Sequence, residues 1–365
     1  MGCCGTISTN SYVTETTRNF NNDTSSSNSN NENEKYIYID KIDNKGFSGK
    51  SIKVISDKTN ICYIIKIIEE RKKLKYAIIE ALLLRKCKHP NIVNIKQFYK
   101  KRNNGNISIN IVTEYANDGD LHIKLKEKEC YDEEILLFWL MQVCFGLSYL
   151  HKKHILHRDI KPQNIFLNKN GLIKIGDLGF SKLIKNEKDE LTRKQTHLGT
   201  WKYMSPEMKE KKKYTSKTDI YSLGMTFIYF IKDGTNYSDS FNNLINSLIE
   251  IDPSKRPSAD EILNNPLIKD KMKRFLEVHN FENSLAYKIF EKIKKQKVKD
   301  EDSFFKLVKN ERKKLCKVEN ENKETEIENK DKETVIENEK LVEKDLDILM
   351  CYIKKRLYDE SNLCQ

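Results

Sequence analysis

Three short segments in the middle of the sequence carry residue types suited to phosphate chemistry. They read HRDIKPQN (157–164), IKIGDLG (173–179) and MSPE (204–207). Carboxylate and amide oxygens, available here from Asp177 and Asn164, are the hard ligands that Mg²⁺ prefers. Reactions of phosphate groups need charge neutralisation and positioning more than covalent help, so a lysine beside a carboxylate is equally suited to them. The segments therefore contain oxygen ligands suited to a divalent cation, and a lysine close to a carboxylate.

In this order and at this spacing, the segments resemble the signature of the eukaryotic protein kinase family: HRDxKPxN, a DLG form of DFG and an SPE form of APE. The resemblance covers about residues 36–267. It implies an α+β, two-lobed kinase fold that uses ATP and Mg²⁺ to phosphorylate proteins. It assigns Asp159 to the substrate hydroxyl and Lys161 to the transferred phosphoryl group. Asn164 and Asp177 are assigned to the metal.

The resemblance also indicates serine/threonine rather than tyrosine specificity. Ser/Thr kinases carry a lysine two residues after the catalytic aspartate, where Lys161 stands, and the pair Gly199-Thr200 points the same way. Phe180 is similar to the bulky residue associated with serine over threonine as acceptor. The segments DIKPQNIFL (159–167) and YMSPE (203–207) look most like the NIMA-related group.

Upstream residues take the places of the family's nucleotide-binding groups. YIIK (63–66) stands where V-A-I-K is found, which implies that Lys66 holds the α- and β-phosphates. Glu80 is its expected ion-pair partner. Backbone groups of Glu114 and Ala116 are expected to meet the adenine ring.

The phosphate-covering loop departs from the family pattern. Asn44 replaces the first glycine of GxGxxGxV and Ser51 replaces its valine, whereas Gly46 and Gly49 are retained. Asparagine tolerates positive φ better than most residues, so we expect the turn to survive. Ser51 shrinks the lid of the nucleotide pocket and Ile64, in place of alanine, enlarges it, so we expect the two volumes to offset each other.

Two further segments suggest regulation. Thr196, three residues before Gly199, is expected to be phosphorylated, and Arg158 is expected to pair with the phosphate. The start Met1-Gly2-Cys3-Cys4-Gly5-Thr6 fits the myristoylation pattern. Because one myristoyl chain binds membranes weakly, a second anchor is needed, and we expect palmitoylation of Cys3 and Cys4. These modifications would place the protein on the cytoplasmic face of a membrane.

Elements able to position these residues can be read from the hydrophobic pattern. We expect a disordered segment 1–34 rich in Asn, Ser and Thr, a kinase domain 35–268, and a charged, partly helical tail 269–365. Period-two alternation predicts strands and helical spacing predicts helices. The expected strands are 36–42, 51–55, 61–68 and 107–115, and the expected helices are 74–87, 135–151 and 216–232. Asp219, Arg256 and Glu207 match scaffold positions, and we expect Arg256 to pair with Glu207.

Composition bears on nucleic-acid binding, on the redox compartment and on membrane spans. The net charge of +12 and 33% charged residues allow anionic partners, but no basic-aromatic motif supports nucleic-acid binding. The nine cysteines form no CxxC pair and suit a reducing compartment. No apolar run reaches the ~18 residues that span a bilayer. A membrane-tethered pseudokinase scaffold stays open as the alternative because of Ser51 and Ile64, while the intact catalytic residues favour an active enzyme.

Overall fold

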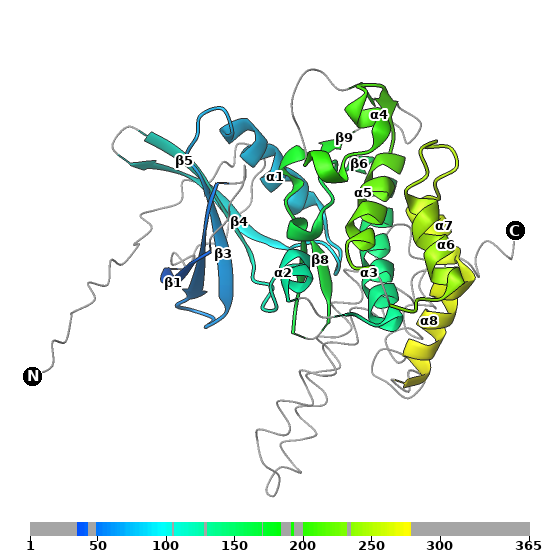
Figure 1. Cartoon of the computed structure of the whole chain (residues 1–365). Coiled ribbons are helices and arrows are strands. Elements are labelled where there is room, and N and C mark those ends of the chain that lie inside the picture. Colours follow the sequence, from blue (N-terminus) through cyan, green and yellow to red (C-terminus); the bar gives the residue numbers. More distant parts are fainter. Residues whose placement is uncertain are drawn as a thin grey trace, which may run out of the picture. The chain divides into compact units, whose positions relative to one another are not determined.

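A computed structural model describes eight stretches of the chain, which divide into two compact units (Figure 1). The described stretches are 35–42, 49–103, 106–127, 130–169, 171–183, 191–192, 200–231 and 235–278. Unit 1 contains the described residues up to Lys86, then Asn94–Tyr115 and Asp177–Gly179. Unit 2 contains Cys87–Val93, Ala116–Gly176 and the described residues from Phe180 onward.

Unit 1 is an antiparallel sheet with one helix. The sheet has the order β1-β2-β3-β5-β4, and every neighbouring pair is antiparallel. The elements are β1 (Tyr36–Ile42), β2 (Lys50–Ser56), β3 (Cys62–Ile68), α1 (Leu74–Lys86), β4 (Ile95–Asn103) and β5 (Asn106–Glu114).

Alternation along the central strands gives the sheet two different faces, because successive side chains of a strand point to opposite sides. One face carries a buried apolar cluster made of Tyr36, Ile52, Val54, Tyr63, Ile65 and Val112. The opposite face carries Lys66, which lies across from Ser51 of β2 and Ile111 of β5. The apolar cluster thus lies on one side of the sheet, and Lys66 lies on the other beside the buried Ile111.

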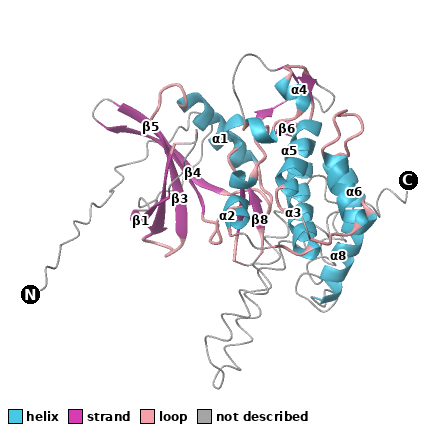
Figure 2. Cartoon of the chain, in the orientation of Figure 1, coloured by secondary structure: helices cyan, strands magenta, loops and turns pink. Residues whose placement is uncertain are grey.

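Unit 2 is mainly helical, as the cyan helices of Figure 2 show. Its longer helices are α3 (Glu133–Lys152), α5 (Lys217–Ile228), α6 (Asp239–Leu248) and α8 (Pro266–Val278), and its short ones are α2 (Leu121–Lys126), α4 (Pro206–Lys209) and α7 (Ala259–Asn264). Paired short strands are β6 (Ile155–Leu156) with β9 (Lys182–Leu183), β7 (Ile165–Leu167) with β8 (Ile173–Ile175), and β10 (Leu191–Thr192) with β11 (Lys213–Tyr214). Three 3₁₀ turns complete the described chain: η1 (Pro162–Asn164), η2 (Leu178–Phe180) and η3 (Trp201–Tyr203).

Helix α3 is the core of unit 2. Nearly all of its residues from Leu136 to Leu150 are buried. Among the described residues it is the one helix long and apolar enough to cross a membrane. Its burial explains the same composition without a membrane, since a helix that is hydrophobic all round belongs inside a protein.

A buried ion pair joins α4 to the chain that follows α6. Arg256 is 1% exposed, and its Nη1 and Nη2 donate to Oε1 and Oε2 of Glu207 at 2.6 and 2.8 Å. The remaining guanidinium N–H groups donate to the backbone oxygens of Glu250, Lys217 and Ile251. A buried charge is tolerated when all its donors are satisfied, as here. The predicted pairing of Arg256 with Glu207 is confirmed.

The predicted elements are present with ends that differ by a few residues, but other elements were not predicted. These include strand β4, helices α6 and α7, and the short strands of unit 2. Helix α8 runs through residue 268, where the domain was expected to end, and continues to Val278. Ile268 and Met272, one helical turn apart, are buried, so this helix extends the packed part of unit 2.

Candidate active site

In unit 1, one lysine lies between two carboxylates. Nζ of Lys66 lies 3.0 and 2.8 Å from Oε1 and Oε2 of Glu80 and 3.0 Å from Oδ1 of Asp177. Lys66 comes from β3, Glu80 from α1, and Asp177 follows β8 in the chain. The predicted Lys66–Glu80 pair is therefore confirmed, and Asp177 shares the same cation.

Burial and the neighbouring charges shift the pKa values of Lys66 and Glu80. Burial alone would lower the pKa of Lys66, but the charges of Asp177 and Glu80 outweigh it and raise that pKa. For Glu80, burial raises the pKa, Lys66 lowers it and Asp177 raises it again, which leaves a pKa of about 7. Burial therefore outweighs the attraction of Lys66, and Glu80 retains a proton more readily than an exposed glutamate does.

The surroundings of Lys66 bring together other residues expected to bind nucleotide. Ser51 is 3% exposed and lies directly across from Lys66, and Ile64 lies across from Thr113, so all four side chains share one face of the sheet. Gly49 has φ +89°, and a Cβ there would lie 2.6 Å from the backbone oxygen of Ile67. Only glycine fits this position.

In unit 2, the carboxylate of Asp159 is buried and surrounded by donors. Its Oδ2 accepts from Nζ of Lys161 at 2.7 Å and from Nδ2 of Asn164 at 3.0 Å. Its Oδ1 accepts from the backbone amide of Thr200 at 3.0 Å and from the Thr200 hydroxyl at 3.4 Å. These four bonds fix the carboxylate in one orientation.

Thr200 is a contact that sequence reasoning missed. The sequence used it only as an indicator of Ser/Thr specificity, whereas its hydroxyl also accepts from Nζ of Lys161 at 2.9 Å. Thr200 is therefore bonded to both members of the Asp159–Lys161 pair. A threonine in a loop, far along the chain from its partners, gives no periodic signal that could have revealed this role.

The loop that carries Asp159 is held by a second buried carboxylate. Asp219, in the first turn of α5, accepts from the backbone amides of His157 at 2.9 Å and Arg158 at 2.8 Å. Its Oδ2 also lies 2.9 Å from Nε2 of His151. Burial would raise the pKa of Asp219, but these bonds and the neighbouring histidine charges lower it. The predicted scaffold role of Asp219 is thus explained by hydrogen bonds to the catalytic loop.

Arg158 adopts a backbone conformation that few non-glycine residues tolerate. Its φ is +66°. Nε donates to the backbone oxygen of Phe180 at 2.7 Å and Nη1 to the hydroxyl of Tyr214 at 3.2 Å. The guanidinium therefore fastens the catalytic loop to the segment after Asp177. Thr196, its expected phosphorylated partner, lies outside the described residues.

Comparison with known proteins decides the family. A family model for the protein kinase domain matches residues 41–238, more than half of the chain. The chain belongs to the protein kinase family.

The kinase is similar to several serine/threonine-protein kinases. Nek4 of Mus musculus is 34% identical over 272 residues, which cover 66% of this chain and 34% of the relative. Nek1 of Mus musculus is 33% identical over 272 residues, covering 66% and 22%. The 3-phosphoinositide-dependent protein kinase B of Dictyostelium discoideum is 32% identical over 250 residues, covering 60% and 27%. The predicted resemblance to NIMA-related kinases is confirmed, and the chain spans about a third or less of these three relatives.

Of the remaining predicted site residues, the structure describes some and not others. Glu114 ends β5, and its Oε1 accepts from the amide of Asn94 at 2.7 Å, while Ala116 begins the next segment of unit 2. Their expected contacts with adenine stay predictions. Five predicted residues lie outside the described part of the chain: Gly2, Cys3, Cys4, Gly46 and Thr196.

The shifted pKa of Glu80 predicts a pH-dependent stability. In the folded kinase Glu80 holds its proton up to about pH 7, whereas in the unfolded chain it releases it near its ordinary value of 4.5. The folded state therefore binds more protons between these values, and the stability that Glu80 contributes is lost as the pH rises through about 7. We expect the melting temperature of nucleotide-free wild type to fall more between pH 5.5 and 8 than that of Glu80→Gln. Equal changes in the two proteins would contradict the assignment.

Proposed function

We propose that this chain is an active Ser/Thr protein kinase, which transfers the γ-phosphoryl group of Mg-ATP to serine and threonine hydroxyls of proteins. The observation that carries the proposal is the buried carboxylate of Asp159, held by Lys161, Asn164 and Thr200. A carboxylate fixed in this way can orient a hydroxyl group for attack and accept its proton.

The place of the substrate hydroxyl can be inferred from Thr200. Its hydroxyl lies 3.4 Å from Oδ1 of Asp159, a long contact, while it accepts a shorter bond of 2.9 Å from Lys161. A serine or threonine of a substrate carries the same group and can form a shorter bond to that carboxylate. Lys161 then places its positive charge close to the reacting oxygen, where negative charge is transferred.

The donor atoms fit the cofactor and the nucleotide that the family implies. Nδ2 of Asn164 donates to the backbone oxygen and to Oδ2 of Asp159, so the amide oxygen is the atom of Asn164 that can bind a cation. Asn164 and Asp177 are the residues that would hold Mg²⁺, which neutralises charge on the phosphates. Lys66, kept charged by Glu80 and Asp177, is the group that would hold the α- and β-phosphates.

The alternative, a pseudokinase scaffold, predicts a site that cannot bind Mg-ATP productively. Ser51 and Ile64 are its only support from the sequence. Both share the sheet face of Lys66, so they bear on the volume available to the nucleotide and not on the catalytic groups. The complete Lys66–Glu80 pair and the Asp159 network favour the enzyme.

We also propose that the amino terminus is anchored to a membrane and that Thr196 controls activity. Gly2 would carry a myristoyl chain, and Cys3 with Cys4 would carry the second anchor that stable binding requires. A phosphate on Thr196 would add about two negative charges, which the guanidinium of Arg158 can bind. Its present contacts with Phe180 and Tyr214 keep this guanidinium at the segment after Asp177.

Replacing Asp159 by Asn tests the proposed activity. The variant keeps the size of the side chain but loses the charge that orients and deprotonates the hydroxyl, so phosphorylation of a protein substrate should fall about 10²- to 10⁴-fold. Mg-dependent ATP binding, measured by calorimetry, should stay within a few-fold of wild type. Chelation of Mg²⁺ with EDTA serves as the control that abolishes transfer in wild type. Activity in Asp159→Asn equal to wild type would reject the mechanism, and absent Mg-ATP binding in wild type would favour the scaffold.

A second variant tests Thr196. Thr196→Ala cannot be phosphorylated, so the kinase should lose most of the activity gained after incubation with ATP, and intact-mass spectrometry should show one phosphate fewer. Thr192→Ala, a threonine of β10 in the same part of the sequence, is the matched control. Unchanged phosphorylation rates in Thr196→Ala would refute the regulatory role.

The lipid anchor is tested in cells. Gly2→Ala removes the amine that accepts myristate, so the protein should move from the membrane pellet to the soluble fraction. Cys3→Ser with Cys4→Ser should leave only the weak binding of a single acyl chain, released by washing. Persistent membrane binding of Gly2→Ala would contradict the model.

A further inference from the structure

The surface next to the catalytic carboxylate is formed by η3 and carries an exposed tryptophan. Thr200, bonded to Asp159, is followed directly by Trp201, which is 61% exposed, and by the exposed Lys202. Large aromatic side chains are usually buried in part, and they are enriched where proteins bind one another. A protein substrate whose hydroxyl reaches Asp159 must therefore lie close to these two side chains.

The η3 turn that carries Trp201 and Lys202 is anchored by buried neighbours. Tyr203 and Met204, the residues that follow, are 6% and 4% exposed, and the ring of Tyr203 packs edge-on against Tyr229. Nζ of Lys202 lies 3.4 Å from the ring centre of Tyr229, a cation–π contact that fixes the direction of the lysine. Trp201 and Lys202 thus point outward from a turn whose other residues are anchored in the core.

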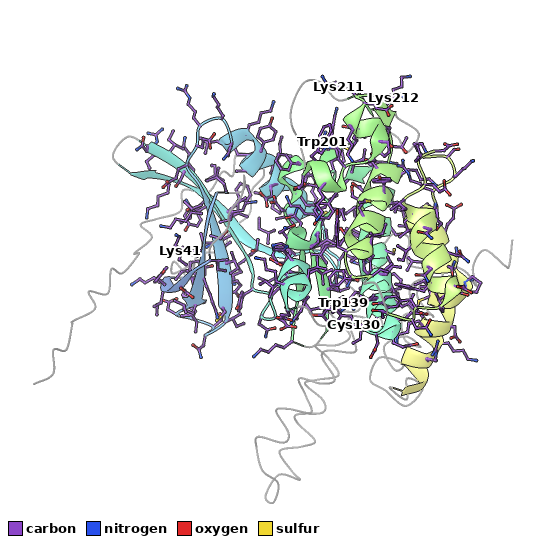
Figure 3. All side chains as sticks on the ribbon, in the orientation of Figure 1. Lys41, Cys130, Trp139, Trp201, Lys211 and Lys212 are labelled. Atoms are coloured by element: carbon purple, nitrogen blue, oxygen red, sulfur yellow. The ribbon has the colours of Figure 1, made fainter. Side chains whose placement is uncertain are left out.

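Cations accumulate around this turn. We call the group the η3–α4 surface; it consists of Trp201, Lys202, Lys209, Lys211, Lys212 and Lys213. Figure 3 shows Trp201, Lys211 and Lys212 at the same end of unit 2, around α4. Nζ of Lys209 lies 5.8 Å from the ring centre of Trp201, so this lysine of α4 adjoins the η3 turn.

The carboxylates within this stretch do not cancel the charge. Glu207 is buried and bonded to Arg256, and Glu210 pairs with Lys212 at 2.6 Å. Among the described residues of 201–213, Lys202, Lys209, Lys211 and Lys212 therefore outnumber the one exposed carboxylate, that of Glu210, which gives the patch a positive potential. Because Arg256 holds α4 through Glu207, Lys209 of α4 stands on an anchored helix.

Neighbouring groups in unit 2 offer little attraction for a basic substrate. Helix α2 packs against η1 of the catalytic loop, and its acidic residues are engaged within the helix region. Asp120 caps α2 by accepting from the amide of Ile123 at 2.9 Å, while Asp118 and Glu127 both pair with Lys124. In the catalytic loop itself, Gln163 is neutral and its Oε1 is buried, so this residue adds no negative charge that would attract a basic substrate.

From these contacts we propose that the η3–α4 surface selects protein substrates carrying an anionic side chain, a carboxylate or a phosphate, within a few residues of the acceptor hydroxyl. Lys202 binds the anion nearest to the acceptor, Trp201 covers the adjacent apolar part of the peptide, and Lys209 of α4 with Lys211 and Lys212, which follow it, attracts further negative charge. The inference rests on the proposed kinase activity and specifies the substrate class of that same site.

The test measures KM and kcat for a matched set of peptides. Each contains one serine in a neutral background, with Ala, Asp, phosphoserine or Lys placed at single positions before and after it. Wild type should show a KM about tenfold lower for the best anionic peptide than for the Ala peptide, with little change in kcat. A larger gain with phosphoserine than with Asp assigns the phosphate as the ligand, and the reverse order assigns the carboxylate.

Variants connect the preference to the surface. Lys202→Met keeps an unbranched side chain over Tyr229 but removes the charge, so it should raise KM for the anionic peptide to near that of the Ala peptide. Lys202→Arg should restore the preference. Lys269→Met is the matched control, because this exposed lysine lies on α8, well away from α4 within unit 2 (Figure 1). Melting temperatures of all variants should equal that of wild type within a few degrees.

The outcomes separate this inference from the proposed function. Transfer to all peptides with equal KM, or a preference that survives in Lys202→Met, overturns the substrate assignment and leaves the kinase activity established. No transfer to any peptide and no Mg-dependent release of ADP by wild type rejects the activity and the inference with it. A preference for the Lys peptide reverses the predicted sign and also overturns the assignment.

Discussion

The catalytic loop depends on one buried carboxylate, that of Asp219. Its side chain is completely buried, yet its pKa is lowered because two backbone amides and His151 bond to it. These amides belong to His157 and Arg158, and the second of them has a positive φ that needs such support. Asp219 lies in the first turn of α5, where the positive end of the helix dipole stabilises a negative charge. Burial of the Asp219 carboxylate costs free energy, but its hydrogen bonds offset that cost and fix the backbone immediately before Asp159.

The same principle, a charge fixed by many donors, recurs with different consequences. Glu207 and Asp159 are each satisfied by several donors, and both are rigid. The triad of unit 1 is different, because Lys66 is shared by the carboxylates of Glu80 and Asp177. Burial, with a smaller contribution from the charge of Asp177, raises the pKa of Glu80 to about 7. The Arg256–Glu207 pair belongs to the scaffold, whereas the shared lysine belongs to the candidate site.

Short sequence motifs predicted contacts between residues that lie far apart in the chain. Lys66 and Glu80 were paired from their motifs, although nothing in their local periodicity connects them. Strand β4 was missed because IKQFYKKRN has four basic residues and an irregular register at Ile95, so its alternation is weak. Helix α8 did carry a signal, the one-turn spacing of Ile268 and Met272, which was outweighed by the charged composition of the segment. Thr200 could not be found, since its role depends on a tertiary contact with Asp159.

Departures from a family pattern are informative when the structure shows what surrounds them. Ile64 and Ser51 stand on the sheet face of Lys66 beside residues that keep the family types, so they modify the volume of a site whose charges are retained. Trp201 and Lys202 stand next to Thr200, outside the bonds that hold Asp159, and the indole is 61% exposed. An exposed aromatic residue contributes little to folding, because its apolar area stays in water. Its position beside a fixed catalytic group is therefore better explained by what binds there than by the stability of the fold.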